Sequence, residues 1–394
     1  VVAALGHLQE RVQRAVAARD GQTVVIEGKT IKAVGPTPAV MIPQGAQVID
    51  LPGHTVIPGI IGLHDHMYYQ MRPHLQSYPY LFLSAGVTTV RTTGSTDSYG
   101  EPNLREQIKR GNAVGPEVIV TGPYLQGDAS YGGLMYNTTS PESAGRVVRY
   151  GAEEGVEWYK AYTTITRENL KAAIDEAHKH GVKVTAHLCS VTFSEAIALG
   201  IDGLEHGFLT DTKYYEGKQP DQCPAVPDSV QYAGVSITDP AVQATIREMV
   251  NKKVGLTSTL AVMELSSPSR VPFDQRVIDA LHPDVRPAVV KYYESGKTAK
   301  DSASRDLLKR AMEFERAFVK AGGLLGAGSD PCCLSVIAGY GDQRNFELLV
   351  EAGFTPEQAV QIMSANGAKI LGIDTRVGTI KPGMQADLVV IQGD

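Results

Sequence analysis

The sequence predicts an α/β protein whose larger part is a (β/α)8 TIM barrel. Three observations support this prediction: eight short apolar runs, helical patterns between them, and glycines at the junctions. The runs are rich in Val, Ile, Leu and Thr, as expected for parallel strands buried on both faces. Eight strands alternating with helices over about 300 residues favour a barrel. A doubly wound open sheet is the alternative, because sequence alone does not close a sheet.

The eight predicted strands follow one another at regular intervals. They cover residues 60–66, 87–93, 117–122, 157–162, 182–188, 203–208, 254–260 and 323–330. Residues 167–180 show helical periodicity, since apolar residues recur at spacings of three and four from Leu170 to Ala177. Gly181 and Gly200 stand between a helical stretch and the next apolar run, where a left-handed residue ends a helix. Such junctions explain part of the glycine content of 40 in 394 residues.

The two ends of the chain differ from the middle. Short strands separated by Gly and Pro are predicted at residues 23–26, 30–34, 47–51 and 387–391. Because chain termini often meet at the surface, we expect both ends to pair in one small β domain. That domain would comprise residues 1–57 and 372–394, and the barrel residues 58–371. Residues 8–20 have a helix-like pattern.

Composition excludes several classes of protein and partner. The chain has 37 Lys and Arg against 43 Asp and Glu, without a basic stripe, so no nucleic-acid partner is expected. No apolar run is long enough to span a membrane, and no membrane partner is expected. Four cysteines predict no disulfide framework, a packing role for Cys189 and a cytoplasmic location. Because the chain opens with Val1, an upstream signal peptide is the open alternative.

A His-x-His motif, His64-Asp65-His66, ends the first predicted strand. Side chains two residues apart on a strand point the same way, so both imidazoles can face one side. The carboxyl ends of barrel strands form the face where active sites lie. Neutral imidazoles are good zinc ligands, although the motif alone is a weak signal.

Further metal-ligating residue types fall at other strand ends. Lys160 lies in the fourth predicted strand, and His187, His206 and Asp330 end the fifth, sixth and eighth. Lysine is rarely buried without a partner, and each residue alone could be a polar side chain near a loop. Together, five strand ends that supply four histidines, a lysine and an aspartate predict one metal site.

With these residues the chain resembles the amidohydrolase superfamily. The resemblance also rests on Val56–His66 and on two C-terminal segments, Ser364–Gly372 and Gly378–Val390. It is strongest to the branch of imidazolonepropionase-like proteins and metal-dependent, prolidase-like dipeptidases. It implies a (β/α)8 barrel with a small β-sandwich domain formed from the N- and C-terminal segments.

The resemblance also implies a binuclear centre with two divalent metal ions, expected to be zinc. His64, His66 and Asp330 would hold one metal, and His187 and His206 the other. Lys160, carboxylated by CO2 to a carbamate, would bridge them. Only a neutral amine forms a carbamate, and burial beside dications lowers a lysine pKa.

The expected activity is hydrolysis of an amide, peptide-like C–N bond of a small molecule, such as a dipeptide or N-acyl amino acid. A metal-bridging hydroxide would attack the carbonyl, and Asp330 would pass the proton to the leaving amine. A mononuclear-type deaminase is one alternative, but such enzymes often carry Glu where this chain has Ser190. Lactone or carbamate hydrolysis is another. A non-catalytic scaffold is least favoured, because every ligand position is filled.

Candidate substrate contacts lie near the predicted strand ends. They are Tyr68, Tyr69, Arg91, Tyr131, Tyr162 and Arg344. An arginine there could hold a substrate carboxylate with two hydrogen bonds. The insert at residues 209–236 either covers the site or forms a tethered surface loop. The expected partners are a small-molecule substrate and further copies of the chain in a homo-oligomer.

Overall fold

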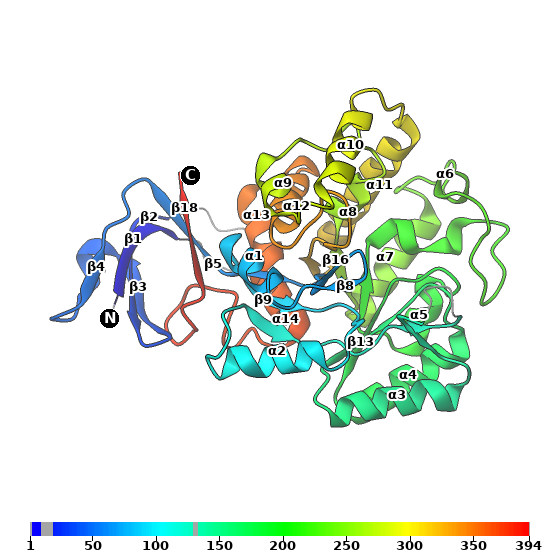
Figure 1. Ribbon diagram of the computed structural model, residues 1–394, viewed down its shortest axis with the longest axis horizontal. Coiled ribbons are helices and arrows are strands. Elements are labelled where there is room, and N and C mark those ends of the chain that lie inside the picture. Colours follow the sequence, from blue (N-terminus) through cyan, green and yellow to red (C-terminus); the bar gives the residue numbers. More distant parts are fainter. Residues whose placement is uncertain (1, 9–18, 129–132, 394) are drawn as a thin grey trace.

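Eight short strands lie inside the eight predicted segments. The computed structural model describes residues 2–8, 19–128 and 133–393 (Figure 1). The strands are β6 (Ile60–Gly62), β9 (Val87–Arg91), β10 (Glu117–Ile119), β13 (Trp158–Ala161), β14 (Lys183–Ala186), β15 (Gly203–Glu205), β16 (Gly255–Ser258) and β17 (Leu325–Ala327). Each is shorter than its predicted segment. Lys160 lies within β13, His187 and His206 directly follow β14 and β15, and the other predicted ligands, His64, His66 and Asp330, lie two to four residues past the ends of β6 and β17.

The strands pair in parallel within three sheets, in the orders β10-β9-β6, β12-β11-β13-β14 and β15-β16-β17. Two short strands, β11 (Leu125–Gln126) and β12 (Tyr136–Asn137), extend the second sheet. Backbone hydrogen bonds also join neighbouring sheets. Asp202 N donates to Val184 O at 3.0 Å, and Leu63 N donates to Ala327 O at 2.8 Å.

Helices connect the strands and pack around them (Figure 1). The α-helices of the larger lobe are α1 (Tyr78–Ser84), α2 (Gly100–Lys109), α3 (Pro141–Glu153), α4 (Arg167–Lys179), α5 (Phe193–Leu199), α6 (Asp228–Gln231), α7 (Pro240–Lys252), α8 (Leu260–Glu264), α9 (Gln275–Ala280), α10 (Arg286–Gly296), α11 (Ser302–Lys320), α12 (Tyr340–Glu351), α13 (Pro356–Gln361) and α14 (Gly367–Leu371). The π-helical turn η4 (Ile362–Asn366) joins α13 to α14. Helix α4 confirms the predicted periodicity.

Local sequence explains where helices begin and end. Helix α5 starts with a capping box, in which the Thr192 side chain accepts from the backbone of Glu195 and the Glu195 side chain accepts from the backbone of Thr192. It ends at Gly200, which has a left-handed φ of +95°. Gly181 follows α4 with φ +70°. Glycine adopts this conformation without a Cβ penalty, which confirms the predicted role of both residues.

The two ends of the chain meet in the smaller lobe (Figure 1). Its strands are β1 (Val2–Leu8), β2 (Arg19–Glu27), β3 (Thr30–Pro36), β4 (Gln47–Ile49), β5 (His54–Pro58) and β18 (Leu388–Gln392), with the short turn η1 (Thr37–Ala39). They form one six-stranded sheet, in which β18 pairs antiparallel with β5. Val24, Ile31, Val56, Ile380 and Met384 form its buried core. The predicted pairing of the two ends is therefore confirmed.

The helix-like pattern at residues 8–20 needs a correction. Leu8 ends β1, and Arg19 and Asp20 begin β2, so both described ends of this segment are strands. Residues 9–18 lie outside the described residues. The hydrogen bonds between neighbouring strands override the helical propensity at these positions.

The insert at residues 209–236 is tied to the carboxyl ends of β13 and β14. It contains part of η2 (Gly207–Thr210), η3 (Thr212–Tyr214) and α6. Cys223 forms a disulfide with Cys189, with the Cα atoms 5.1 Å apart, so the prediction of no disulfide is wrong. The two cysteines are 34 residues apart and meet only through the fold. Lys218 Nζ also donates to Ser190 O at 2.7 Å.

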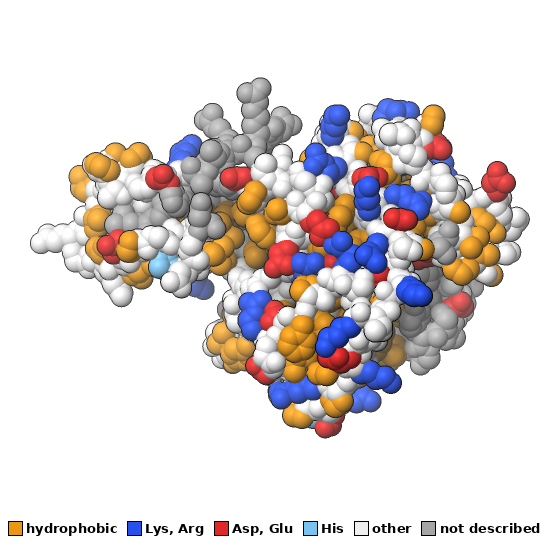
Figure 2. Space-filling model, turned by 90° about the horizontal axis from the view of Figure 1, so that it is seen from above, with side chains coloured by type: hydrophobic (Ala, Val, Ile, Leu, Met, Phe, Trp, Pro, Cys, Tyr) orange, Lys and Arg blue, Asp and Glu red, His pale blue; other side chains and the backbone are white. Residues whose placement is uncertain are grey.

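Surface charge is mixed in sign. Figure 2 shows Lys and Arg side chains interspersed with Asp and Glu over the visible face of the larger lobe. Of the helices that the structure describes, none combines the length and the apolar character that a membrane span requires.

Candidate metal centre

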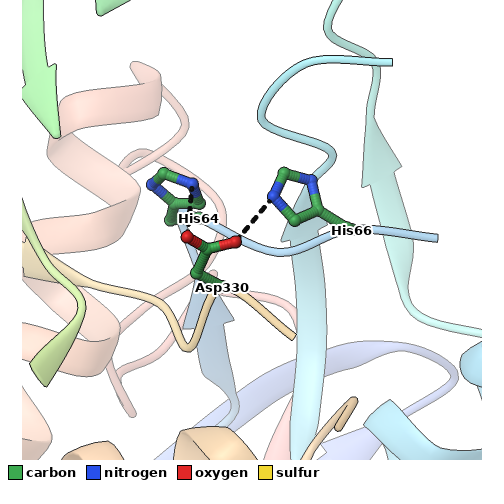
Figure 3. A group of neighbouring side chains, drawn as sticks. All are labelled: His64, His66 and Asp330. Carbon is green, nitrogen blue, oxygen red and sulfur yellow. Dashed lines mark hydrogen bonds and ion pairs between the residues drawn. The ribbon is translucent and has the colours of Figure 1, made fainter. Parts of the chain in front are cut away.

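Three predicted ligands converge between β6 and β17 (Figure 3). His66 Nε2 lies 3.0 Å from Asp330 Oδ1, and His64 Nε2 lies 3.7 Å from Asp330 Oδ2. One ligand atom from each residue lies within 4.8 Å of the others. Asp65 points away, because its Oδ1 accepts from Ser329 Oγ at 2.8 Å. Although His64 and His66 lie past the end of β6, their side chains still alternate in direction with that of Asp65, so both imidazoles lie on one side.

The other three predicted ligands border this cluster. Lys160 Nζ donates to His64 Nε2 at 2.8 Å. His206 Nε2 lies 4.0 Å from Asp330 Oδ2, and its ring centroid is 4.5 Å from that of His64. The His187 centroid lies 4.3 Å from that of His206. The fold thus brings all six predicted residues together from five strands.

Burial keeps the histidines neutral. It lowers the pKa of His66 to about 4 and that of His187 to about 3, and it lowers the pKa of His64 and His206 as well. Burial also lowers the pKa of Lys160 to about 8. At neutral pH each imidazole therefore has a nitrogen lone pair available for a metal.

The surroundings of His206 also suit a metal ligand. His206 Nδ1 lies 2.7 Å from Thr259 Oγ1, which can accept a hydrogen bond from the Nδ1–H group. His206 Nε2, which faces Asp330, is buried and has no hydrogen-bond partner in the described part of the chain. Because buried polar atoms are nearly always paired, a lone pair left free beside a carboxylate suits a metal ligand.

Two of these residues adopt an uncommon backbone conformation. His206 has φ +64° and Asp330 has φ +53°, both in the left-handed region. Non-glycine residues there cost energy and are enriched at functional sites. His206 directly follows β15, and Asp330 comes three residues after the end of β17, where the chain turns away from each strand.

A charged floor lies beneath the cluster, and we define it as Glu205, Arg91 and Thr185. Glu205 Oε2 accepts from His64 Nδ1 at 2.8 Å, while Glu205 Oε1 accepts from Arg91 Nη2 at 2.6 Å and from Thr185 Oγ1 at 2.5 Å. Burial acts to raise the pKa of Glu205, but Arg91 and His64 hold it well below its usual range. The ion pair with Arg91 and the hydrogen bonds that both oxygens accept therefore suit an ionised carboxylate at the end of β15.

The floor corrects the predicted role of Arg91. Its side chain is 1% exposed, and its guanidinium is occupied by Glu205 and lies 4.6 Å from the Trp158 ring centroid. A substrate carboxylate would have to displace Glu205 to bind there. The sequence did carry a signal, because Arg91 and Glu205 are opposite charges within apolar strands, and such residues are buried only when paired.

Tyrosines form one side of the cluster. The Tyr68 ring stacks on His66 at a centroid distance of 4.4 Å, and the Tyr162 centroid lies 4.9 Å from that of His187. Tyr124, which was not predicted, lies between them, with its hydroxyl 2.6 Å from that of Tyr68 and 3.5 Å from His66 Nε2. We define Tyr68, Tyr124 and Tyr162 as the tyrosine wall.

A tight hairpin supports the tyrosine wall. It joins β7 (Tyr68–Tyr69) to β8 (Arg72–Pro73) through Gln70 and Met71, which have φ of +49° and +59°. Gln70 N donates to Cys332 O at 2.7 Å. The Met71 side chain packs against the buried cluster that includes Tyr68 and Tyr124.

The remaining predicted substrate contacts lie elsewhere. Tyr69 is buried and donates its hydroxyl to Leu334 O at 2.9 Å. Arg344 on α12 makes two hydrogen bonds of 2.8 Å to Glu264 and pairs with Glu347, so its guanidinium is already occupied. Tyr131 lies outside the described residues.

Comparisons with known proteins agree with this geometry. The sequence profile of the Amidohydrolase family matches residues 55–394. An imidazolonepropionase from Shewanella loihica is 43% identical over 60 residues, which cover 15% of this chain and 13% of that protein. The match thus spans about an eighth of the length of this curated relative.

Two solved structures share the fold. A candidate prolidase from Bifidobacterium longum has a TM-score of 0.74 at 24% identity, with 100% of this chain and 89% of that chain covered. An Xaa-Pro dipeptidase with methionine bound in its active site has a TM-score of 0.71 at 20% identity, with 100% and 94% covered. The family and these structures imply a TIM barrel with an additional domain. Since the profile covers most of the sequence, the chain belongs to the amidohydrolase family.

Proposed function

We propose that this protein is a binuclear metal-dependent hydrolase that cleaves an amide, peptide-like C–N bond of a small molecule. A dipeptide or an N-acyl amino acid is the substrate class we favour. One observation carries the proposal: four neutral imidazoles, a lysine amine and a carboxylate converge at the carboxyl ends of five parallel strands. The shared fold with an Xaa-Pro dipeptidase supports this class.

The distances between the side chains support the ligand assignment. His64, His66 and Asp330 would hold one divalent metal, and His187 and His206 the second. Zinc suits this set, because imidazole nitrogen and carboxylate oxygen are its usual ligands. When bound, such a metal lowers the pKa of a water and polarises a carbonyl oxygen.

Lys160 would join the metals as a carbamate. Its neutral amine nitrogen would form a bond to the carbon of CO2 and release one proton, which gives an anionic oxygen ligand. Lys160 is 2% exposed, and its Nζ atom lies 5.3 Å from the Tyr124 ring centroid. A buried site that lowers the lysine pKa favours the amine that this step requires.

Asp330 would carry the proton. Its side chain is 16% exposed, whereas those of His64 and His66 are almost fully buried, so it borders the space that a substrate can enter. The carboxylate would accept a proton from the attacking water and donate it to the leaving amine nitrogen. The tyrosine wall would line the approach to this carboxylate.

The environment of Ser190 disfavours the deaminase alternative. Ser190 is 1% exposed, and its hydroxyl donates to Ile165 O at 2.6 Å. A side chain that is buried and bonded in this way does not replace the glutamate that many deaminases carry at this position. This supports a hydrolase over a mononuclear-type deaminase.

The same proposal extends to architecture. We propose that the eight strands close into one barrel, which the hydrogen bond from Leu63 N to Ala327 O supports. We further propose a β-sandwich domain of residues 1–57 and 372–394 beside a barrel of residues 58–371, supported by the pairing of β18 with β5. A homo-oligomeric state and a cytoplasmic location remain predictions.

One experiment tests the function directly. Purified protein is stripped of metal, reloaded with zinc, and supplied with a library of dipeptides and N-acyl amino acids. We expect up to two zinc ions per chain and amide hydrolysis that depends on them. Active protein without metal would contradict the proposal, and release of ammonia from an amidine or aminopurine panel would favour the deaminase.

A further inference from the structure

The charged floor beneath the metal centre has a geometry that suits a positioning role. We propose that Glu205, clamped by Arg91, is a positioning residue that fixes the tautomer and orientation of His64 for metal binding. The proposal rests on the proposed function, because it concerns the same site. It adds a residue that touches neither substrate nor metal.

Hydrogen bonding at His64 permits one neutral tautomer. A carboxylate that pairs with a guanidinium only accepts hydrogen bonds, and Glu205 Oε1 lies 2.6 Å from Arg91 Nη2, so the 2.8 Å contact with Glu205 Oε2 requires the proton on His64 Nδ1. His64 Nε2 then carries the lone pair, and it accepts from Lys160 Nζ at 2.8 Å. Nε2 is also the nitrogen that faces Asp330. The carboxylate thus selects the nitrogen that can bind a metal.

Arg91 holds both Glu205 and the chain beside His64. Its Nη2 donates to Glu205 Oε1 at 2.6 Å, and its Nε donates to Leu63 O at 2.6 Å. Leu63 directly precedes His64 in the chain. One guanidinium therefore fixes the carboxylate that orients the imidazole and the backbone that carries it.

Glutamine at position 205 would break this selection without changing the size of the side chain. If the amide NH2 faces Arg91, donor meets donor. If it faces His64, Nδ1 must accept, and the proton moves to Nε2, where it blocks metal binding. Adding Arg91→Met removes the donor that faces the amide NH2. The double variant still lacks the carboxylate, so it separates the loss of the negative charge from the change of tautomer.

Glu315 provides a matched control. It is also a fully buried glutamate, on α11 rather than under the cluster. Neither of its oxygens has a hydrogen-bond partner in the described part of the chain. Glu315→Gln therefore makes the same chemical change in the core away from the site.

The test measures zinc affinity and histidine tautomer in full-length protein. Zinc affinity is obtained by competition with a chromophoric chelator. The tautomer is read from imidazole ¹⁵N shifts of the metal-free protein, with His64 assigned by substitution. We expect Glu205→Gln and the Arg91→Met, Glu205→Gln double variant to bind zinc about 10–100-fold more weakly, the range for loss of a ligand's hydrogen-bond partner. Glu205→Gln should also lose the Nδ1–H form, and the double variant should regain it, because without Arg91 the amide oxygen can turn toward Nδ1. Glu315→Gln should match the wild type.

The outcomes separate this inference from the proposed function. Wild-type zinc affinity and an unchanged His64 tautomer in Glu205→Gln would overturn the positioning role, even if the enzyme is active. A wild-type protein that binds no zinc would contradict the proposed function. In that case the His64 tautomer, which is measured without metal, still tests whether Glu205 positions His64. If Glu205→Gln fails to fold, the double variant, which lacks the donor conflict but also lacks the carboxylate, supplies the zinc affinity, and wild-type affinity there would overturn the proposal.

Discussion

Two fully buried glutamates in this protein have opposite protonation behaviour. Glu205 lies under the metal centre, where Arg91 and His64 overcome the effect of burial and hold its pKa well below the usual range. Glu315 lies on α11, where burial raises its pKa to about 8. Its oxygens have no hydrogen-bond partner among the described residues. Both side chains are equally buried, so the pKa values differ because Glu205 has a cationic partner, Arg91, beside it.

The comparison shows what distinguishes a site from a core in this fold. An unpaired buried carboxyl gains a proton and becomes neutral, which suits packing. A carboxylate kept ionised needs a buried cation, and that cation needs fixed partners of its own. At Glu205 these partners come from several strands, and their hydrogen bonds connect them to His64.

Asp330→Asn should have the largest effect on activity. The amide keeps the size of the side chain but does not accept the proton of the attacking water. We expect kcat to fall by about 10²–10⁴-fold, the range for loss of a general acid–base group. Amide hydrolysis is measured by amine release, and circular dichroism checks that the fold survives. A fully active variant would mean that another group carries the proton.

Lys160→Ala should cause the second-largest loss of activity. It removes the amine that would form the carbamate, so we expect kcat to fall at least about 100-fold, beyond the loss typical of an outer partner of a ligand. The space left by the side chain should let acetate or another short carboxylic acid restore part of the activity. Kinetics unchanged from the wild type would remove Lys160 from the site.

Arg91→Met should cost stability as well as function. It leaves the Glu205 carboxylate buried without its cation, and breaking a buried ion pair costs about 3–5 kcal/mol. Urea unfolding measures this loss in the free energy of unfolding. Lys171→Met, which breaks the exposed pair with Asp175, serves as the control and should change little. Equal stability of the two variants would contradict the contrast between floor and surface.

Glu315→Gln should change the pH dependence of stability. Between its ordinary pKa of 4.5 and its raised pKa of about 8, the native carboxyl holds a proton that the unfolded one has lost. The group therefore makes stability fall as pH rises, by up to about 1.4 kcal/mol per pH unit. Glutamine should flatten the curve of unfolding free energy between pH 5 and 8. Parallel curves would show that Glu315 is ionised in the fold.

Arg344→Lys should have the smallest effect. Its guanidinium is bound by Glu264 and Glu347, away from the cluster of histidines. We expect kcat/KM for each substrate to match that of the wild type, with a small loss of stability. A selective rise in KM for substrates with a free carboxylate would return Arg344 to the substrate site.

The sequence predicted the strands and the six clustered residues because both follow local rules. Alternation placed His64 and His66 on one side, and parallel strands carried Lys160, His187 and His206 to the same end. These inferences need only the order and direction of the strands, which short apolar runs reveal.

The parts that the sequence did not predict depend on pairs far apart in the chain. Arg91 and Glu205 are 114 residues apart, so no local pattern pairs them, and the charge of Arg91 by itself suggests a substrate contact. Cys189 and Cys223 meet through two loops whose paths no local pattern describes. Tyr124 follows β10 in a stretch without a recognisable motif, and its contact with Tyr68 arises only when the strands are assembled.

The hairpin at Gln70 and Met71 has a consequence for engineering. Two-residue hairpin loops with both residues left-handed favour Asn-Gly, and this loop uses neither residue. The Met71 side chain instead fills space against Tyr68 and Tyr124. Introducing Asn-Gly should therefore ease the turn and open the tyrosine wall to bulkier substrates, but the lost packing of Met71 opposes the gain in melting temperature. Position 71 thus links thermal tolerance to substrate range, which makes this loop a first target for directed evolution.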